Sequence, residues 1–329
     1  MDKKKLDIIG IGDTVVDAFI HLEIGTISEV NGQRDLCIPF ATKIPYESVT
    51  VVNAVGNSAN AVVSAARLGL NAGIITFLGY DRHGEDCLNQ FKKENIVTDF
   101  IKQEEDKQTN YHYALWKEDD RTILIKHEHF TYSLPDIGTP KWIYLSSLGE
   151  SSQDFHVEIS NYLEKNPDVK LAFQPGTYQM KFGTEALSTI YKRTEVFIAN
   201  VEEIQGILKT EEKDIKKIMD MTEDLGPKII LITDGPAGSY MKANGNYYNM
   251  PVYPDNAKPV ERTGAGDAYA STFVSHIIKG MPPEEAILRA PINSMNVVQY
   301  VGAQAGLLSE NEIEHYLKNA PESYKLKNI

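Results

Sequence analysis

Nearly continuous apolar runs alternate with segments of helical periodicity along most of this chain. Apolar runs without polar alternation are typical of strands buried on both faces of a parallel sheet. They predict strands at 6–11, 74–78, 142–145, 169–173, 195–199 and 229–233. Between them, apolar residues at helical spacing predict helices near 58–68, 84–94, 152–165, 184–192 and 211–224. Strands and helices that take turns in this way predict right-handed βαβ units and a layered α/β fold with a mostly parallel sheet.

Two stretches, residues 18–50 and 107–131, carry alternating apolar and polar positions instead. Alternation favours antiparallel strands with one solvated face, and the acidic residues 118–120 favour a turn between two of them. Because each stretch follows a predicted core strand, we expect the two to form a small β lid at one edge of the sheet. The sequence has no Pro/Ser-rich linker, so we expect one domain over residues 1–329 that includes this lid.

Charge limits the classes of partner. The chain has 329 residues, of which 33 are Lys or Arg and 46 are Asp or Glu, so its formal charge is −13. Nonspecific binding to nucleic acid or to an anionic membrane favours a basic surface, which this composition does not supply. Any phosphate group must therefore be bound by a local device, such as a helix N-terminus, backbone amides or a metal.

The compartment follows from the cysteines and from apolar run lengths. Cys37 and Cys87 cannot make a disulfide framework and have no zinc-ligand spacing, which indicates a reducing compartment. The N-terminal residues lack the apolar segment of a signal peptide, and no run approaches the ~18 to 20 apolar residues of a membrane span. We therefore expect a cytoplasmic protein that binds neither nucleic acid nor membranes.

Several motifs of cofactor and metal sites are absent or weak. The sequence contains no P-loop. Gly10-Ile11-Gly12 follows a predicted strand, but Val15 stands where a dinucleotide fingerprint has its third glycine. His127 and His129 would share one side of a strand, where a metal is conceivable. The favoured interpretation is two polar side chains on a solvated face of the lid.

The strongest motif is the glycine-rich segment 263–267, which leads into a helical pattern through residue 278. A helix N-terminus carries unpaired N–H groups and partial positive charge, and small residues let a phosphate approach them. Gly264, Ala265 and Gly266 therefore form a candidate anion hole, with Asp267 in the first helical turn. Asp267 is either an acidic residue that favours a helix start or a general base that takes a hydroxyl proton. The motif alone leaves both interpretations open.

Asn200 and Glu203 follow the predicted strand 195–199 at a second helix start. Their oxygens could hold hydrated Mg²⁺ and nucleotide phosphates. An N-cap followed by an acidic first turn also explains the pair and, on these residues alone, is the favoured interpretation.

Together, these motifs make the chain resemble the PfkB, or ribokinase-like, family of carbohydrate kinases. The family's signature Asp-Thr-x-Gly-Ala-Gly-Asp corresponds to residues 261–267, and its Gly-Gly-x-x-x-Asn loop corresponds to residues 55–60. Further matches are residues 65–69, 79–84, the Asn-x-x-Glu pattern at 200–203 and the Thr-x-Gly-x-x-Gly loop at 233–238. The matches run in order from Gly12 to Ala303 and cover nearly the whole chain.

The resemblance implies a three-layer α/β/α ribokinase-like fold with a β lid. It implies ATP-dependent phosphoryl transfer to a hydroxyl of a sugar or sugar-like molecule, with Mg²⁺, and leaves open a monovalent cation such as K⁺. Carried over residue by residue, it makes Asp267 the base and Gly264, Ala265 and Gly266 the anion hole. The substrate would contact Asp13, Asp17, Gly56, Asn57 and Asn60. The nucleotide would contact Asn200, Thr233, Gly235 and Gly238, and the metal would contact Glu203.

The sequence departs from the family pattern near these motifs. Val55 replaces a glycine, Glu261 and Arg262 replace Asp and Thr, and Gln174 stands where many relatives have Asp. These departures leave the substrate less defined than the reaction. An adenosine-type nucleoside kinase and a catalytically silent sugar or nucleotide sensor are the alternatives. Pairing of the exposed lid edges across a two-fold axis predicts a homodimer.

Overall fold

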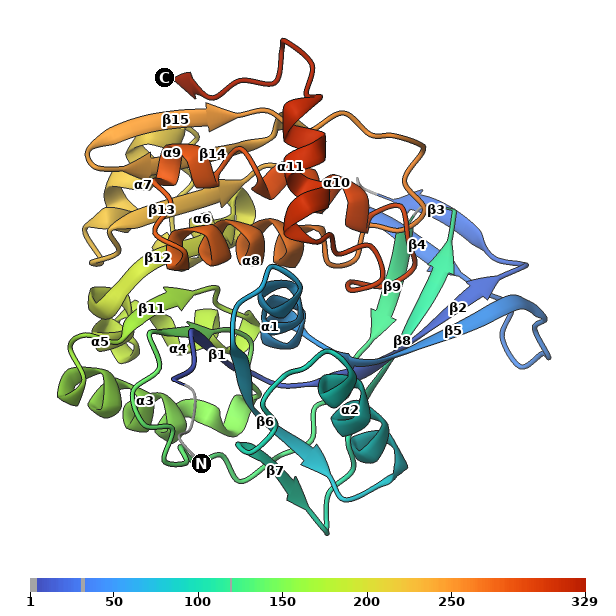
Figure 1. Cartoon of the computed structure of the whole chain (residues 1–329). Helices are drawn as coiled ribbons and strands as arrows, with labels where there is room; N and C mark the ends of the chain where they lie inside the picture. The colour runs from blue at the N-terminus through green and yellow to red at the C-terminus, as the bar shows by residue number, and fades with distance from the viewer. Residues whose placement is uncertain (1–4, 31–32, 119) are drawn as a thin grey trace.

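The computed structural model describes residues 5–30, 33–118 and 120–329. Residues 1–4, residues 31–32 of the predicted lid and Asp119 of the predicted turn lie outside that range. The main sheet has the order β16-β15-β14-β13-β12-β11-β10-β1-β6-β7 and is parallel from β13 to β7 (Figure 1). Its parallel strands are β1 (Ile8–Ile11), β6 (Ala72–Gly79), β7 (Ile101–Glu104), β10 (Trp142–Leu145), β11 (Lys170–Phe173), β12 (Thr194–Asn200) and β13 (Ile229–Thr233). All six predicted core strands are confirmed.

Four strands of this sheet were missed. β7 is a half-buried edge strand with mixed polarity, so it has no apolar run. β14 (Ser239–Ala243), β15 (Asn246–Met250) and β16 (Lys327–Asn328) are antiparallel at the other edge. Asn244 and Gly245 close the β14–β15 hairpin with φ of 52° and 75°. The Asn-Gly dipeptide of a two-residue turn was therefore a usable signal for this hairpin.

Helices cover both faces of the main sheet, as the three-layer prediction requires. Alternate strand residues point to opposite sides: Ile8 and Ile74 join the core under α1 and α8, whereas Ile9 and Ile75 join the core under α3 and α6. The helices are α1 (Asn57–Arg67), α2 (Arg82–Lys93), α3 (Gln153–Lys165), α4 (Thr177–Ala186), α5 (Ser188–Arg193), α6 (Val201–Leu208), α7 (Ile215–Glu223), α8 (Ala265–Ile278), α9 (Pro283–Ala286), α10 (Ala290–Val297) and α11 (Glu310–Lys318). Over the described ranges, no helix is long and apolar enough to cross a membrane.

Two helix predictions need correction. The helix expected at 184–192 is two helices, α4 and α5, separated at Leu187, whose φ and ψ of −103° and 19° are not helical. The helix expected at 211–224 begins only at Ile215, because the Asp214 side chain accepts a hydrogen bond from the Lys216 N–H and caps the helix there.

A second sheet projects from the main body (Figure 1), and we call it the small sheet. Its order is β5-β2-β8-β9, with β2 (Val15–Leu22), β5 (Tyr46–Val55), β8 (Asn110–Lys117) and β9 (Asp120–Leu124). A separate hairpin, β3 (Thr26–Val30) and β4 (Gln33–Cys37), extends beside it. Antiparallel pairing is confirmed within each predicted stretch, for β2 with β5 and for β8 with β9, but the pairing between the two stretches, of β2 with β8, is parallel. Both strands leave the main sheet in the same direction, β2 after β1 and β8 after β7.

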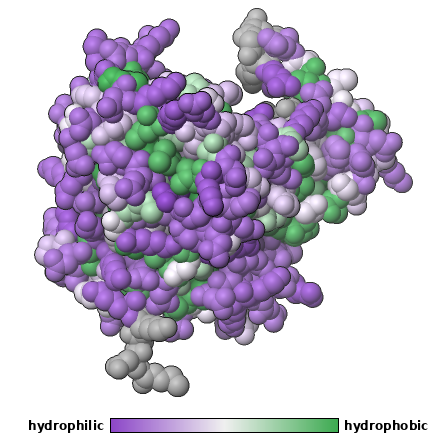
Figure 2. Space-filling model, turned by 45° about the horizontal axis from the view of Figure 1, so that its top comes forward, coloured by the Kyte–Doolittle hydropathy of each residue, from purple (hydrophilic) through white to green (hydrophobic). Residues whose placement is uncertain are grey.

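The small sheet has the one solvated face that the alternation predicts. Phe19 and Ala114 pair across β2 and β8 and are buried toward the main body. The neighbouring row consists of Val51, Ala18, Tyr113 and Leu124, of which all but Ala18 are about half exposed. The small sheet projects on the right of Figure 2, where hydrophobic residues are exposed within a mostly hydrophilic surface.

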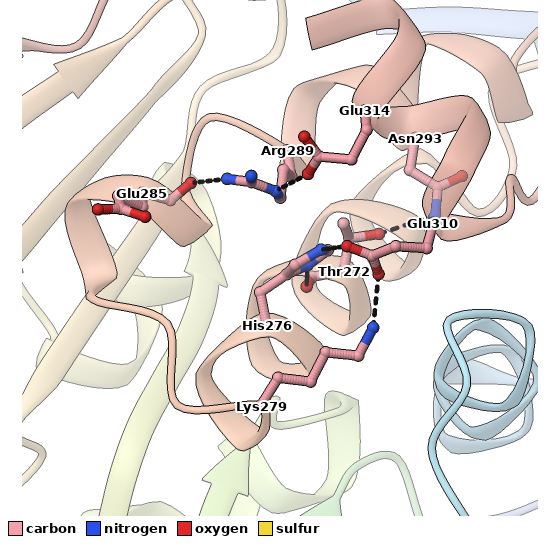
Figure 3. Close-up of polar contacts among 8 residues, drawn as sticks. All are labelled: Thr272, His276, Lys279, Glu285, Arg289, Asn293, Glu310 and Glu314. Atoms are coloured by element: carbon pink, nitrogen blue, oxygen red, sulfur yellow. Dashed lines mark hydrogen bonds and ion pairs between the residues drawn. The ribbon is translucent and has the colours of Figure 1, made fainter.

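Polar contacts hold the C-terminal helices against α8 (Figure 3). The fully buried His276 of α8 contacts the Thr272 carbonyl through Nδ1 at 2.7 Å and Glu310 of α11 through Nε2 at 3.1 Å. Asn293 of α10 donates to the Thr272 hydroxyl at 2.8 Å. These bonds fix the C-terminal half of α8 and thereby the direction in which its N-terminus points.

Candidate active site

Candidate residues gather where the parallel strands end. Asp13, Gln174 and Asn200 lie at or just beyond the C-terminal ends of β1, β11 and β12, and Asn200 is in register with Thr233 at the end of β13. Ligands of open α/β sheets bind outside these carboxyl ends. α6 begins directly after β12, and Asn57 at the start of α1 contacts Asp267 at the start of α8, so the topology brings the predicted residues together.

The N-terminus of α8 has the backbone that an anion hole needs. Gly264 has a φ of 82°, and an added Cβ would lie 2.3 Å from the Cβ of Ala303, so only glycine fits. No side chain caps the helix, which leaves its first-turn N–H groups available to a ligand. An ideal Cβ on Gly266 would meet no atom within 4 Å, so the approach to this turn is open.

A cavity of about 410 Å³ joins the anion hole to the predicted nucleotide residues. Thr233, Gly235 and Gly238 line it from the β13–β14 connection, and Ala265 and Gly266 line it from α8. Its remaining walls are largely apolar and include Val252, Tyr269, Met295 and Val298. Arg262 also lines this cavity and is exposed, so one of the departures from the family pattern faces the predicted phosphate end.

Asp267 is surrounded by three amide donors. Its Oδ1 accepts hydrogen bonds from Asn57 at 3.0 Å and from Gln174 at 3.1 Å, and its Oδ2 accepts one from Asn60 at 2.8 Å. Burial raises the pKa of Asp267, and the three amides act against that shift because they stabilise the carboxylate. A carboxylate held at a helix N-terminus beside an open cavity is suited to accept a proton.

Asp13, one of the predicted substrate residues, is buried. The Tyr132 hydroxyl lies 3.0 and 2.9 Å from its two carboxylate oxygens, and the Gly149 N–H donates to the same hydroxyl at 3.1 Å. Burial raises the pKa of Asp13 to about 7, despite the bond from Tyr132. Gly56 lies directly against this residue: it has a φ of 120°, and a Cβ there would be 2.5 Å from the Asp13 carbonyl oxygen. Gly56 therefore lets β5 and α1 approach Asp13.

Asp17 lies on the inner face of the small sheet, in register with His112. Its Oδ1 is 3.5 Å from His112 Nδ1 and makes no hydrogen bond among the described residues. Three neighbouring buried atoms share that condition within the described chain: Asn110 Nδ2, His112 Nε2 and His127 Nδ1. Buried polar atoms ordinarily have partners, so this group of atoms suits a polar ligand.

The interpretation of His127 and His129 as two side chains on a solvated face holds for His129, which is exposed, but only partly for His127. The His127 ring is half-buried and lies 5.5 Å from that of His112 and 5.8 Å from that of Tyr178. The alternative interpretation, a metal pair with His129, gains no support, since the described residues contain no group of three or more His, Cys, Asp or Glu that could hold a metal ion.

Asn200 and Glu203 form a capping box at the start of α6. Asn200 Oδ1 accepts from the Glu203 N–H at 2.8 Å, and Glu203 Oε2 accepts from the Asn200 N–H at 2.9 Å. Burial and the charges of Asp267 and Glu202 raise the pKa of Glu203. The carboxylates of Glu203 and Asp267 therefore repel each other, and a hard cation bound between them would relieve that repulsion. The cap and a Mg²⁺ role are compatible, because Oε1 is not used by the cap.

Several residues of the site were not identified as candidates from sequence. Tyr132, Tyr144, His112 and Gln304 carry no local motif, and Gln174 was visible only as a departure from a family pattern. Gln174 contacts Asp267 directly, and Tyr144 donates to Gln174 at 2.5 Å. Gln304 donates to Asn60 at 3.0 Å. Their roles depend on contacts between residues far apart in the chain.

Comparisons with known proteins identify the family and the fold of the chain. A family model described as "pfkB family carbohydrate kinase" matches residues 28–310. A ribokinase of Haemophilus influenzae is 24% identical over 310 residues, which cover 89% of this chain and 98% of that protein. The structure of Arabidopsis thaliana ribokinase with ribose and ATP aligns with a TM-score of 0.76 at 17% identity, over 95% of this chain and 99% of that one. A Methanocaldococcus jannaschii nucleoside kinase aligns with a TM-score of 0.74 at 19% identity, over 96% and 99%.

Proposed function

Since the chain belongs to the PfkB family of carbohydrate kinases and has the ribokinase-like fold, we propose that it transfers the γ-phosphate of ATP to a hydroxyl of a sugar, with Asp267 as general base. The observation that carries this proposal is the position of Asp267: it lies in the first turn of the uncapped helix α8, directly after Ala265 and Gly266, which line the cavity of about 410 Å³. The substrate hydroxyl gives its proton to Asp267 as its oxygen attacks phosphorus. The N–H groups after Gly264 stabilise charge on the transferred group.

The nucleotide would occupy the cavity that Thr233, Gly235 and Gly238 line. The cavity reaches Ala265 and Gly266, so the phosphates would lie at the α8 N-terminus. Its apolar walls suit the nucleobase. When bound, Mg²⁺ would neutralise negative charge on the phosphates. Glu203 Oε1 would hold this ion, directly or through water, and Asn200 would lie beside the phosphates.

The acceptor would lie between Asp267 and the small sheet. Asn57 and Asn60 of α1 contact Asp267 on one side, and Asp13 and Asp17 offer carboxylate oxygens to sugar hydroxyls on the other. Closure of the small sheet as a lid would exclude water from the transfer, which prevents ATP hydrolysis from competing with it.

We expect the protein to be a homodimer through the small sheet. Val51, Tyr113 and Leu124 are 47–53% exposed in one row, and β5 and β9 leave open strand edges. Pairing with a second copy would cover both. In sedimentation velocity, Leu124→Lys should convert the dimer to monomer, whereas Val157→Lys, at a similarly exposed valine on α3, should not. A wild-type monomer at micromolar concentration would contradict the proposal.

ADP release with a panel of neutral sugars, sugar phosphates, sugar acids and nucleosides tests the function. Preferred turnover of a nucleoside would favour the nucleoside-kinase alternative, and no turnover with any member would favour a silent sensor. With the best acceptor, Asp267→Asn should lower turnover by at least about 10²-fold, because the general base is lost. Asp214→Asn, at the exposed N-cap of α7, is the matched control and should retain activity. Turnover within a few-fold of wild type in Asp267→Asn would remove Asp267 from the role of base.

A further inference from the structure

Two of the amides that contact Asp267, those of Asn60 and Gln174, are themselves hydrogen-bonded to further buried side chains. Asn60 Oδ1 accepts from Gln304 Nε2 at 3.0 Å, and the same Nε2 donates to the carbonyl oxygen of Ala54 at 2.7 Å. On the other side, Gln174 Oε1 accepts from the Tyr144 hydroxyl at 2.5 Å. Tyr144 and Gln304 are buried, and neither touches Asp267 by a hydrogen bond.

These contacts determine which end of each amide faces the carboxylate. The Ala54 carbonyl can only accept, so the Gln304 nitrogen must point toward it, and the second N–H on that nitrogen then points to Asn60. Asn60 must therefore present its oxygen to Gln304 and its NH₂ to Asp267. The ionised Asp267 can only accept, so the Gln174 NH₂ faces it, and the Gln174 oxygen then accepts from the Tyr144 hydroxyl.

The donors are distributed unequally over the two carboxylate oxygens. Oδ1 accepts from both Asn57 and Gln174, whereas Oδ2 accepts from Asn60 alone. Each carboxylate oxygen has two lone pairs in the carboxylate plane, so Oδ1 is saturated and Oδ2 keeps one pair. Hydrogen bonds donated to the ionised form also oppose the rise in the pKa of Asp267 that burial causes.

We propose that Gln174 and Asn60 are positioning residues for the base, oriented by Tyr144 and Gln304, and that Oδ2 of Asp267 is the atom that takes the proton. This inference rests on the proposed function. In the transfer, the substrate O–H bond breaks and its proton binds Oδ2. The electron pair left on oxygen forms the new bond to the γ-phosphorus, and the bond from that phosphorus to the ADP oxygen breaks. Gln174, a departure from the family pattern, places a neutral donor where a carboxylate would repel Asp267.

Two other ionisable groups face Asp267 and enter its titration. Glu203 at the start of α6 is close enough for its own pKa to be raised by the charge of Asp267. Burial, with a smaller contribution from the charge of Asp267, raises the pKa of the Tyr144 phenol well above its usual range, so its proton is retained for donation to Gln174. The neighbours on α1 and after β11 are the neutral amides Asn57, Asn60 and Gln174.

The test is the titration of Asp267, followed by ¹³C NMR of labelled aspartate carboxyls, with Asp267→Asn to assign the resonance. Tyr144→Phe frees the Gln174 amide to turn, and we expect the Asp267 midpoint to rise by about one pH unit. Gln174→Glu should raise it further, because two carboxylates then compete for one proton. Tyr191→Phe removes another buried phenol, one that packs on Phe173 and Phe197, and should leave the midpoint unchanged.

The same variants are then assayed by the pH dependence of kcat/KM, with the panel member of highest turnover as acceptor. The acid limb should move to higher pH in Tyr144→Phe and not in Tyr191→Phe. An Asp267 midpoint that is equal in Tyr144→Phe, Tyr191→Phe and wild type would overturn the inference. If Asp267→Asn is inactive and the midpoint is unmoved, only this inference fails. If Asp267→Asn stays active, the proposed function fails. The NMR titration then still tests whether Tyr144 orients the Gln174 amide toward Asp267.

Discussion

Replacing Asp13 by asparagine should stabilise the protein above neutral pH and leave its stability in acid unchanged. Burial raises the pKa of Asp13 from 3.8 to about 7, so the folded state holds the proton more tightly than the unfolded chain does. The stability that this proton contributes is present below about pH 4 and is lost as the pH rises to 7. A shift of about three units corresponds to roughly 4 kcal/mol, which is an upper bound for the gain in Asp13→Asn. Asparagine keeps the oxygen that accepts from Tyr132.

The measurement is the difference in unfolding free energy between variant and wild type, from urea denaturation at several pH values between about 4 and 8. The difference should be close to zero at the acid end, grow with pH and level off above about pH 7. Asp168→Asn, at an exposed position without a hydrogen bond among the described residues, should give no difference throughout. A difference independent of pH, or a loss of stability at pH 8, would falsify the assignment of a raised pKa to Asp13.

Two further predictions concern ligands. Glu203→Gln should raise the Mg²⁺ concentration for half-maximal rate, because a hard, charged oxygen becomes neutral while the cap to the Asn200 N–H is retained; an unchanged Mg²⁺ titration would limit the Asn200–Glu203 pair to a capping role. Asp17→Ala should weaken sugar use by roughly 1.5–3 kcal/mol, the contribution of a hydrogen bond to a charged group. Binding of a non-hydrolysable ATP analogue by calorimetry should stay unchanged there, and equal losses for sugar and nucleotide would mean that Asp17 supports the fold.

Periodicity predicted the six central strands because each is buried on both faces, and such burial leaves an apolar run that the sequence displays directly. Edge elements carry no such run: β7 is half-buried along its length. The parallel pairing of β2 with β8 could not be predicted from the sequence either, because alternation indicates a solvated face but not the relative direction of two strands. In the site, residues within motifs could be predicted because glycine is required by backbone geometry, as at Gly264. Tyr132, His112 and Gln304 could not, because their partners lie far away in the chain.

The departure at Glu261 has a physical explanation in the small sheet. Glu261 is fully buried, and its Oε1 accepts hydrogen bonds from the Thr263 N–H at 2.8 Å and the Thr263 hydroxyl at 2.6 Å. The same oxygen lies 3.2 Å from Nε of Arg121 on β9. Burial of a carboxylate is costly unless the group is paired or hydrogen-bonded, and an aspartate, one methylene shorter, would not reach both partners from the same backbone position. Glutamate at this position therefore ties the loop that leads into the anion hole to the small sheet, and the position of that sheet bears on the geometry of the α8 N-terminus.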